Sequence, residues 1–287
     1  MPEGHVIHRL AGELAMAFAG RAVRVTSPQG RFADAAALLD GGTFRAAEAF
    51  GKHLLIDFGT ALPEQDAEGR GLDRGGPGPF VHIHLGLIGK LRWVRPGPVE
   101  GADTLRLRIE TDLHAAELRG PQTCALIGPD EAAALIEGLG PDPLRADADP
   151  ARAWQRVHRS GRSIASLLMD QRVAAGVGNI YRAEVLYRQR IHPDTPGNVL
   201  SARAWQRIWS DLVELMPLGV RHGRIDTVRP EHLPEAMGRA PRVDPHGGEV
   251  YVYRRAGLPC LVCGREVRVR EFEGRNLYWC PRCQRRR

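Results

Sequence analysis

Two closely spaced pairs of cysteines near the C-terminus constrain this 287-residue chain more than any other feature. Cys260 and Cys263 form one Cys-x2-Cys pair, and Cys280 and Cys283 form a second. Two such pairs allow four thiolates to surround one Zn²⁺ tetrahedrally. Two disulfides are the alternative, but the start of the chain lacks signal-peptide features, and disulfides are rare in the cytoplasm. We therefore expect one structural zinc, because four cysteine ligands leave no position open for a catalytic water.

The residues between the two pairs predict a β-hairpin. Valines alternate with arginines over 267–270, a Glu-Gly turn follows at 273–274, and the segment 277–279 is again apolar. The turn places Arg275 at the tip, where a basic side chain on a zinc-bound base can meet a phosphate group. The alternative is that Arg275 is one of many solvated arginines.

Hydrophobic spacing divides the rest of the chain into a strand-rich part and a helical part. Alternating patterns predict strands at 22–26, 44–50, 53–58, 80–85, 89–94 and 104–110. Helical spacing predicts helices at 6–19, 131–139, 151–159, 163–170, 180–188 and 202–216. Stretches rich in Gly, Pro and charged residues predict loops at 60–79 and 224–248.

These patterns predict an α+β protein of several domains. We expect an N-terminal β-sandwich domain at 1–122, a helical domain at 130–248 and a zinc-finger β-hairpin at 249–287. The fifth cysteine, Cys124, has no partner motif and is expected to be a small buried hydrophobic residue.

The composition favours a polyanionic partner. The formal net charge is +6 and the pI is about 9.4. Only Lys52 and Lys90 among the 40 basic residues are lysines, and an ammonium, unlike a guanidinium, can be tuned to release a proton. No apolar run reaches the roughly 20 residues of a membrane span. We therefore expect a cytoplasmic protein with no membrane partner.

Short motifs follow one another along the whole chain. They are Pro-Glu-Gly at 2–4, Gly-Lys-His-Leu-Leu at 51–55, His-Leu-Gly-Leu-Ile-Gly at 84–89, Leu-Gly-Pro-Asp-Pro-Leu at 139–144, Leu-Leu-Met-Asp-Gln at 167–171, Gly-Val-Gly-Asn-Ile-Tyr-Arg-Ala-Glu at 176–184 and the cysteine pairs with Gly-Arg-Asn-Leu-Tyr-Trp at 274–279. In this order they resemble the formamidopyrimidine-DNA glycosylase/endonuclease VIII (Fpg/Nei) family. The Met-Pro-Glu-Gly-His start resembles its actinobacterial endonuclease VIII branch most.

The resemblance implies a fold and an activity. The fold would combine the β-sandwich, a helix-two-turn-helix in the helical domain and the zinc finger, with DNA in the cleft between the lobes. The activity would be that of a bifunctional DNA glycosylase/AP lyase in base excision repair. Its substrate would be double-stranded DNA with damaged bases or abasic sites. The protein would be a monomer associated with the nucleoid.

The resemblance also implies roles for individual residues. It makes Pro2 the Schiff-base nucleophile, Glu3 a general acid, Lys52 and Arg275 active-site cations, and Asn179 a contact to a phosphate. Removal of Met1 is required, because only then does Pro2 carry an amine, and an α-amine with a pKa near 8 is partly neutral at pH 7. Glu3 can act as an acid if burial raises its pKa. The alternative for Lys52 is an ordinary strand lysine.

Two turns are candidates for DNA contacts. Leu87 matches the position from which the family inserts an apolar wedge into the space left by a flipped base, although a core position is the alternative. The turn at 176–179 leads into a helix whose backbone amides suit a phosphate. His82 and His84 alternate on a predicted strand, which suggests a metal, but packing or a phosphate contact is the favoured interpretation.

This chain departs from the family pattern at two places. The family often has a second glutamate three residues after the first, and here that position is Val6. The stretch 224–248 does not clearly match the loop that caps guanine lesions in the Fpg branch. The resemblance to the endonuclease VIII branch implies oxidised pyrimidines as substrates and β,δ-elimination as the strand-cutting reaction. The alternatives are a preference for oxidised purines, or a zinc-finger protein that binds damaged DNA without cutting it.

Overall fold

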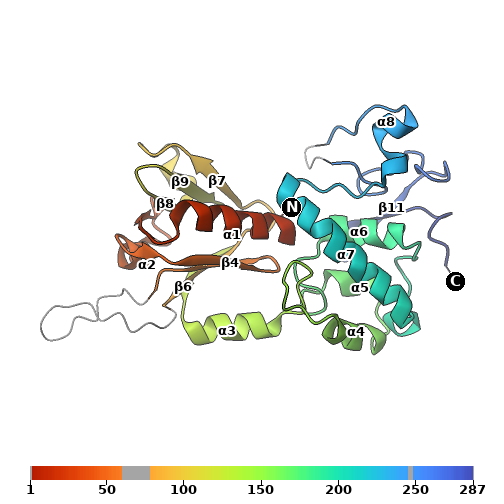
Figure 1. Ribbon diagram of the computed structural model, residues 1–287, viewed down its shortest axis with the longest axis horizontal. Helices are drawn as coiled ribbons and strands as arrows, with labels where there is room; N and C mark the ends of the chain where they lie inside the picture. The colour runs from red at the N-terminus through yellow and green to blue at the C-terminus, as the bar shows by residue number, and fades with distance from the viewer. Residues whose placement is uncertain (1, 60–77, 245–247, 287) are drawn as a thin grey trace, which may run out of the picture. The chain divides into compact units, whose positions relative to one another are not determined.

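The computed structural model describes residues 2–59, 78–244 and 248–286, and its contacts divide the chain into two compact units. One unit contains Pro2 and Ile7–Gly138, and the other contains Glu3–Val6 and Leu139–Arg287. Figure 1 shows the chain and labels its larger helices and several of its strands. Most of the predicted loop at 60–79, and residues 245–247 of the one at 224–248, lie outside the described residues.

The first unit is built on two four-stranded antiparallel sheets, which confirms the predicted N-terminal sheet domain. The strand orders are β10-β6-β5-β4 and β2-β8-β9-β7, and β1 pairs with β3. The strands are β1 (Arg21–Ala22), β2 (Arg24–Thr26), β3 (Thr43–Phe44), β4 (Ala46–Phe50), β5 (His53–Asp57), β6 (Phe80–His84), β7 (Lys90–Val94), β8 (Leu105–Glu110), β9 (Ala115–Arg119) and β10 (Thr123–Ile127). The helical segments are α1 (Gly4–Phe18), which begins in the second unit, α2 (Ala33–Leu39), η1 (Ala102–Thr104) and α3 (Pro129–Gly138).

Strand β9 was not predicted from the sequence. Its residues, Ala-Ala-Glu-Leu-Arg, have no strong strand preference by themselves. They form a strand because β8 and β7 pair with both of its edges. The polar side of β8 is also buried: Arg108 is 3% exposed, donates to Glu117 at 2.7 Å and pairs with Glu110. A buried ion-pair network of this kind does not appear in a hydrophobic pattern.

The second unit is helical and ends in the predicted hairpin. Its elements are α4 (Pro150–His158), α5 (Ile164–Met169), α6 (Asn179–Arg188), η2 (Gly197–Val199), α7 (Ala202–His222), η3 (Pro230–His232), α8 (Pro234–Met237), β11 (Arg268–Phe272) and β12 (Arg275–Trp279). Helix α6 is central: nine of its ten residues are buried, and it contacts α5, α7 and β12 (Figure 1). None of the described helices is long and apolar enough to cross a bilayer.

Helix α7 continues past the predicted end at residue 216. Pro217 lies inside the helix, where proline lacks the N–H that an interior position donates. The helix nevertheless extends to His222 and closes with Gly223 in the left-handed conformation. In this last part Gly219 packs so closely on α6 that an added Cβ would lie 2.4 Å from the hydroxyl of Tyr181. This tertiary packing accompanies the continuation of the helix beyond the proline.

The loop that follows α7 is attached to α6 by a buried carboxylate. Glu184 is fully buried and accepts the backbone N–H groups of Tyr251, Val252 and Tyr253 at 2.7, 2.9 and 2.8 Å. The hydroxyl of Thr227 donates to it at 2.6 Å. Glu184 therefore satisfies an irregular segment that has no sheet or helix partners of its own.

Candidate functional site

Glu3 is bound at the N-terminus of α6. Its side chain is fully buried, and its carboxylate accepts the backbone N–H groups of Gly178 at 3.2 Å, Ile180 at 2.7 Å and Tyr181 at 3.3 Å. The first amides of a helix have no partners within the helix, and the helix dipole favours negative charge there. Glu3 is thus the anion that this helix end holds.

This contact corrects the prediction that the same amides suit a phosphate. The three N–H groups of Gly178, Ile180 and Tyr181 are used by the chain's own carboxylate. The partners lie 175 to 178 residues apart in the sequence, so no local pattern could reveal them. The contact also changes the expectation for Glu3: burial favours a neutral carboxyl group, but three N–H donors stabilise its negative charge.

The glycines around this helix end allow the first residues of the chain to pack closely against it. A Cβ on Gly178 would lie 2.4 Å from Cδ of Glu3, which is too close for any side chain. The N–H of Gly4 donates to the carbonyl of Gly176 at 2.8 Å, and a Cβ on Gly4 would lie 2.8 Å from Cα of Gly176. The glycine-rich turn therefore serves to admit the N-terminal residues of the chain.

Pro2 is half-buried and immediately precedes this anchored residue. Both Pro2 and Glu3 come before α1, which begins at Gly4, two residues before the predicted start at residue 6. One peptide bond joins Pro2 to a side chain that three hydrogen bonds immobilise. The position of Pro2 is therefore restricted by its bond to Glu3, and so is that of any reactive group on it.

Asn179 holds the hairpin strand that begins at Arg275. Asn179 is 5% exposed, and its Nδ2 donates to the carbonyl of Asn276 at 3.0 Å. The buried Arg182 donates to Oδ1 of Asn179 and reaches the same carbonyl at 3.5 Å. Arg275 pairs with Phe272 across the hairpin, at its tip, as predicted. The structure thus brings Asn179 into direct contact with the strand that begins at Arg275. Arg182, which the sequence did not single out, supports this contact.

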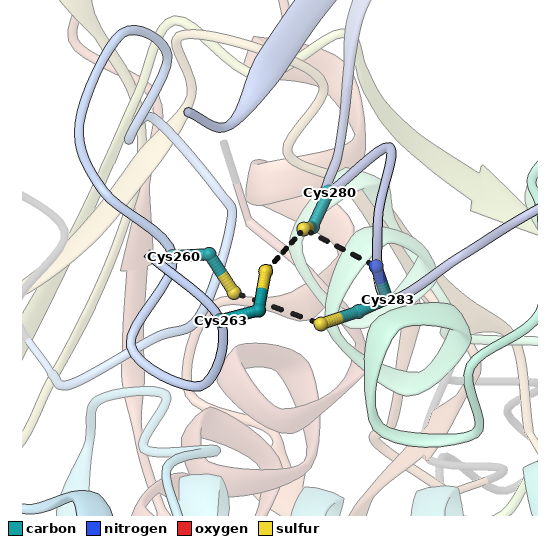
Figure 2. Close-up of side chains that lie close together, drawn as sticks. All are labelled: Cys260, Cys263, Cys280 and Cys283. Atoms are coloured by element: carbon teal, nitrogen blue, oxygen red, sulfur yellow. Dashed lines mark hydrogen bonds between the residues drawn. The ribbon is translucent and has the colours of Figure 1, made fainter. Parts of the chain in front are cut away.

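The four cysteines converge on a space suited to one metal ion (Figure 2). The Sγ atoms of Cys260 and Cys283 are 3.9 Å apart, and those of Cys263 and Cys280 are 3.5 Å apart. Four sulfurs at about 2.3 Å from a tetrahedral zinc would be separated by about 3.8 Å, whereas a disulfide requires about 2.05 Å. The cysteines are free thiols, and the predicted zinc site fits them.

In the first unit, Lys52 lies in the two-residue turn that joins β4 to β5, and not within a strand. The next residue, His53, belongs to a group of three histidines: its Nδ1 is 2.9 Å from Nε2 of His82, and its ring centroid is 5.0 Å from that of His84. Burial, followed by the charges of His82, His84 and Lys52, lowers the pKa of His53 to about 4. The ring therefore stays neutral at pH 7.

The histidines do not form a metal centre in this structure. Within the described part of the chain, only the four cysteines bring three or more potential ligand atoms within 4.8 Å of one another. Packing or a phosphate contact stays the prediction for His82 and His84. Cys124 is only partly buried, but burial still raises the pKa of its thiol to about 12, which makes it unreactive.

Leu87 is exposed at the turn between β6 and β7. Its side chain is 64% exposed and that of the next residue, Ile88, is 78% exposed. The N–H of Gly89 donates to the carbonyl of Leu85 at 3.0 Å and closes the turn. A core position for Leu87 is therefore excluded, and the two adjacent apolar side chains are available to a partner.

Family models cover most of the chain. The formamidopyrimidine-DNA glycosylase N-terminal domain matches residues 1–124, the formamidopyrimidine-DNA glycosylase H2TH domain matches 139–229, and the zinc finger found in FPG and IleRS matches 257–286.

Curated relatives match over similar lengths. Endonuclease 8 1 of Mycobacterium tuberculosis is 46% identical over 291 aligned residues, which cover 99% of this chain and 100% of the relative. Formamidopyrimidine-DNA glycosylase of Methylococcus capsulatus is 32% identical over 82% of this chain and 79% of its own length.

Solved structures share the fold. The Lactococcus lactis Fpg bound to abasic-site DNA superposes with a TM-score of 0.75 at 23% identity and covers 99% of this chain and 100% of its own. MutM (Fpg) from Thermus thermophilus superposes with a TM-score of 0.72 at 24% identity, over 99% of this chain and 98% of its own.

Proposed function

Because the chain belongs to the formamidopyrimidine-DNA glycosylase/endonuclease VIII family, whose members are DNA glycosylases with AP lyase activity, we propose a specific reaction for it. The enzyme acts in base excision repair. It removes oxidised bases, pyrimidines in preference, from double-stranded DNA and cuts the strand at the resulting abasic site. The cut proceeds by β,δ-elimination through a Schiff base on Pro2.

One observation carries this proposal: Glu3 is anchored at the N-terminus of α6, one peptide bond from Pro2. A chain terminus is normally mobile, and a nucleophile on it would rarely adopt a reactive geometry. Here the residue after the nucleophile is fully buried and accepts three backbone N–H groups. Such an arrangement has a clear use if the terminal amine must meet one atom of a bound substrate.

The first step exchanges two bonds at C1′ of the damaged nucleotide. After removal of Met1, the neutral secondary amine of Pro2 attacks C1′, the N–C1′ bond forms, and the bond from C1′ to the base breaks. The base leaves with the proton that the attacking amine gives up. Opening of the sugar ring breaks the bond from C1′ to the ring oxygen, and solvent supplies the proton that this oxygen takes up. The product is an iminium ion, which carries a permanent positive charge because the proline nitrogen has no hydrogen left to lose.

The iminium ion then draws electrons from the neighbouring bonds. Loss of the C2′ proton breaks the bond from C3′ to its oxygen and releases the 3′ phosphate. A second elimination, with loss of the C4′ proton, breaks the bond from C5′ to its oxygen and releases the 5′ phosphate. Glu3 can move protons in these steps, and its hydrogen bonds favour its role as an anion that accepts the C2′ proton before it acts as an acid.

The remaining site residues act on the DNA. Lys52 and Arg275 neutralise phosphates beside the lesion, and the guanidinium of Arg275 can bind one phosphate through two hydrogen bonds. Asn179 contacts a phosphate, and Leu87 fills the space that the flipped nucleotide leaves. The zinc bound by the four cysteines holds the hairpin fold and supplies no reaction chemistry, since all four ligands are protein thiolates. Metal analysis should find one zinc per chain.

The preference for oxidised pyrimidines rests on two points. The relative with 46% identity carries the name Endonuclease 8 1, and the 224–248 stretch does not clearly match the loop of the Fpg branch. A panel of duplexes with thymine glycol, 5-hydroxyuracil or 8-oxoguanine tests it. Faster excision of 8-oxoguanine than of both pyrimidines would reverse the assignment within the same family.

Borohydride trapping tests the nucleophile. Wild-type enzyme should form a covalent adduct with an abasic-site duplex when borohydride reduces the iminium ion. An enzyme with one extra residue fixed before Pro2 should form none, because its proline nitrogen is then an amide. No adduct with the wild type would sink the proposal and favour a protein that binds damaged DNA without cutting it.

A further inference from the structure

The hairpin tip contains a residue that its backbone does not favour. Glu273 and Gly274 form the two-residue turn between β11 and β12, and both have positive φ, 50° and 69°. A turn of this type prefers Asn, Asp or Gly at its first position, because other side chains crowd the backbone in the left-handed region. A glutamate at this unfavourable position suggests that its side chain makes a specific contact.

That contact is a hydrogen bond to α5. The hydroxyl of Ser166, which is 2% exposed, donates to Oε1 of Glu273 at 2.7 Å. Arg162 in turn donates to the same hydroxyl oxygen at 2.6 Å and pairs with Asp170 at 3.0 Å. The serine hydroxyl thus has a donor on one side and an acceptor on the other, and this arrangement orients its proton towards Glu273.

The other side of the tip is held by α6. The carbonyl of Asn276 accepts from Asn179 at 3.0 Å and from Arg182 at 3.5 Å. The tip segment, residues 273–276, is therefore tied to α5 through its first residue and to α6 through its last. Arg275 lies between these two attachments.

We propose that Glu273 is a positioning residue for Arg275 and that Ser166 is its partner. The bond to Ser166 fixes the turn from which Arg275 extends, and it keeps a carboxylate near the phosphate-binding cation in one orientation. Without that bond the negative side chain could approach the phosphate that Arg275 is to bind. This inference rests on the proposed role of Arg275 as a phosphate contact.

The variant Glu273→Asn separates the role of this residue in the turn from its hydrogen bond to Ser166. Asparagine is the better turn residue, so the hairpin should fold at least as well, but its side chain is too short to reach Ser166. We expect KM for an abasic-site duplex to rise about tenfold, as for a lost hydrogen bond to a charged group, with kcat changed less than twofold. The dependence of KM on salt should weaken, because a phosphate contact is impaired.

The variant Glu273→Gln should rescue the enzyme. Its side-chain oxygen still accepts the Ser166 proton, and the negative charge is gone, so KM should equal or fall below that of the wild type. Ser166→Ala should raise KM as Glu273→Asn does, and the double variant should add little to either. Glu271→Asn on β11 and Ser210→Ala on α7, both exposed positions, are the matched controls and should leave KM within twofold.

Zinc content, melting temperature and borohydride trapping are measured on every variant. An unchanged KM in Glu273→Asn would overturn the inference, as would a Gln variant as impaired as the Asn variant. A rise in KM accompanied by loss of zinc or a lower melting temperature would assign Glu273 to hairpin folding and also overturn it. Trapping by the wild type tests the proposed function separately, so its failure is distinguishable from these results.

Discussion

Two buried glutamates bind backbone amides in the same way, at different places in the second unit, and the consequences differ. Glu3 and Glu184 are both fully buried, and each accepts three backbone N–H groups. Glu184 extends from α6 and binds an internal loop at 251–253, whereas Glu3 comes from the chain start and binds the first turn of α6. The bonding is shared, so the position along the chain decides what each carboxylate can do.

The difference lies in what each contact immobilises. Glu184 holds backbone on both sides of the contact, far from either end of the chain. Glu3 holds the end itself, next to the residue that becomes the terminal amine when Met1 is removed. We therefore propose that Glu184 serves stability alone, whereas Glu3 serves both stability and the proposed reaction.

The largest effect is expected for Glu184→Gln. Its two oxygens receive two donors each, so the amide nitrogen of glutamine would face two donors in a buried site. We expect the free energy of unfolding to fall by about 3 kcal/mol. Urea denaturation measures the loss, while kcat of the folded fraction should stay within threefold. A loss below about 1 kcal/mol would show that this carboxylate is not a structural anchor.

Glu3→Gln should have the opposite effect, a small loss of stability and a large loss of activity. It retains part of the hydrogen bonding and should cost about 1 to 2 kcal/mol of stability, but it removes the proton acceptor and should lower the single-turnover elimination rate about a hundredfold or more. Single-turnover kinetics on an abasic-site duplex checks the rate. If Glu3→Gln and Glu184→Gln lost activity and stability in the same ratio, the distinction between the two glutamates would fail.

Gly178→Ala tests the close packing of Glu3 on this turn while Glu3 itself stays unchanged. The new methyl group would overlap Cδ of Glu3, so we expect a loss of about 1 to 3 kcal/mol in stability, as for overpacked cores, and slower elimination. Gly12→Ala is the matched control. Its Cβ would meet nothing within 4 Å in the interior of α1, so it should stabilise the helix by about 0.5 to 1 kcal/mol.

The smallest effect concerns pH and extends the comparison to the first unit. The pKa of His53 is lowered from 6.5 to about 4, chiefly by burial, so the unfolded chain takes up a proton first as the pH falls. The stability of the first unit should therefore be complete above pH 6.5 and decline between 6.5 and 4. Thermal melting from pH 7 to 4 should show the decline, and His53→Asn should reduce it. An equally steep decline in that variant would assign it to other groups.

Local features of the fold were predictable from the sequence. The cysteine spacing, the Glu-Gly turn and the position of Arg275 at the hairpin tip depend on residues within 24 positions of one another, and the structure confirms them. Strand β9 and the end of α7 were missed, because pairing with two neighbours and packing against α6 override weak local preferences. Only the structure could show that Leu87 is exposed.

The sequence by itself determined which chemical groups the chain carries and which of them are neighbours: a proline and a glutamate at the start, four thiols in two pairs, and a glycine-rich turn before a helix. The tertiary structure alone decided that the glutamate lies at that helix, 175 residues away in the chain, and takes the amides that a phosphate was expected to use. The physical reason is that a helix end attracts any anion, and only folding decides which anion lies within reach.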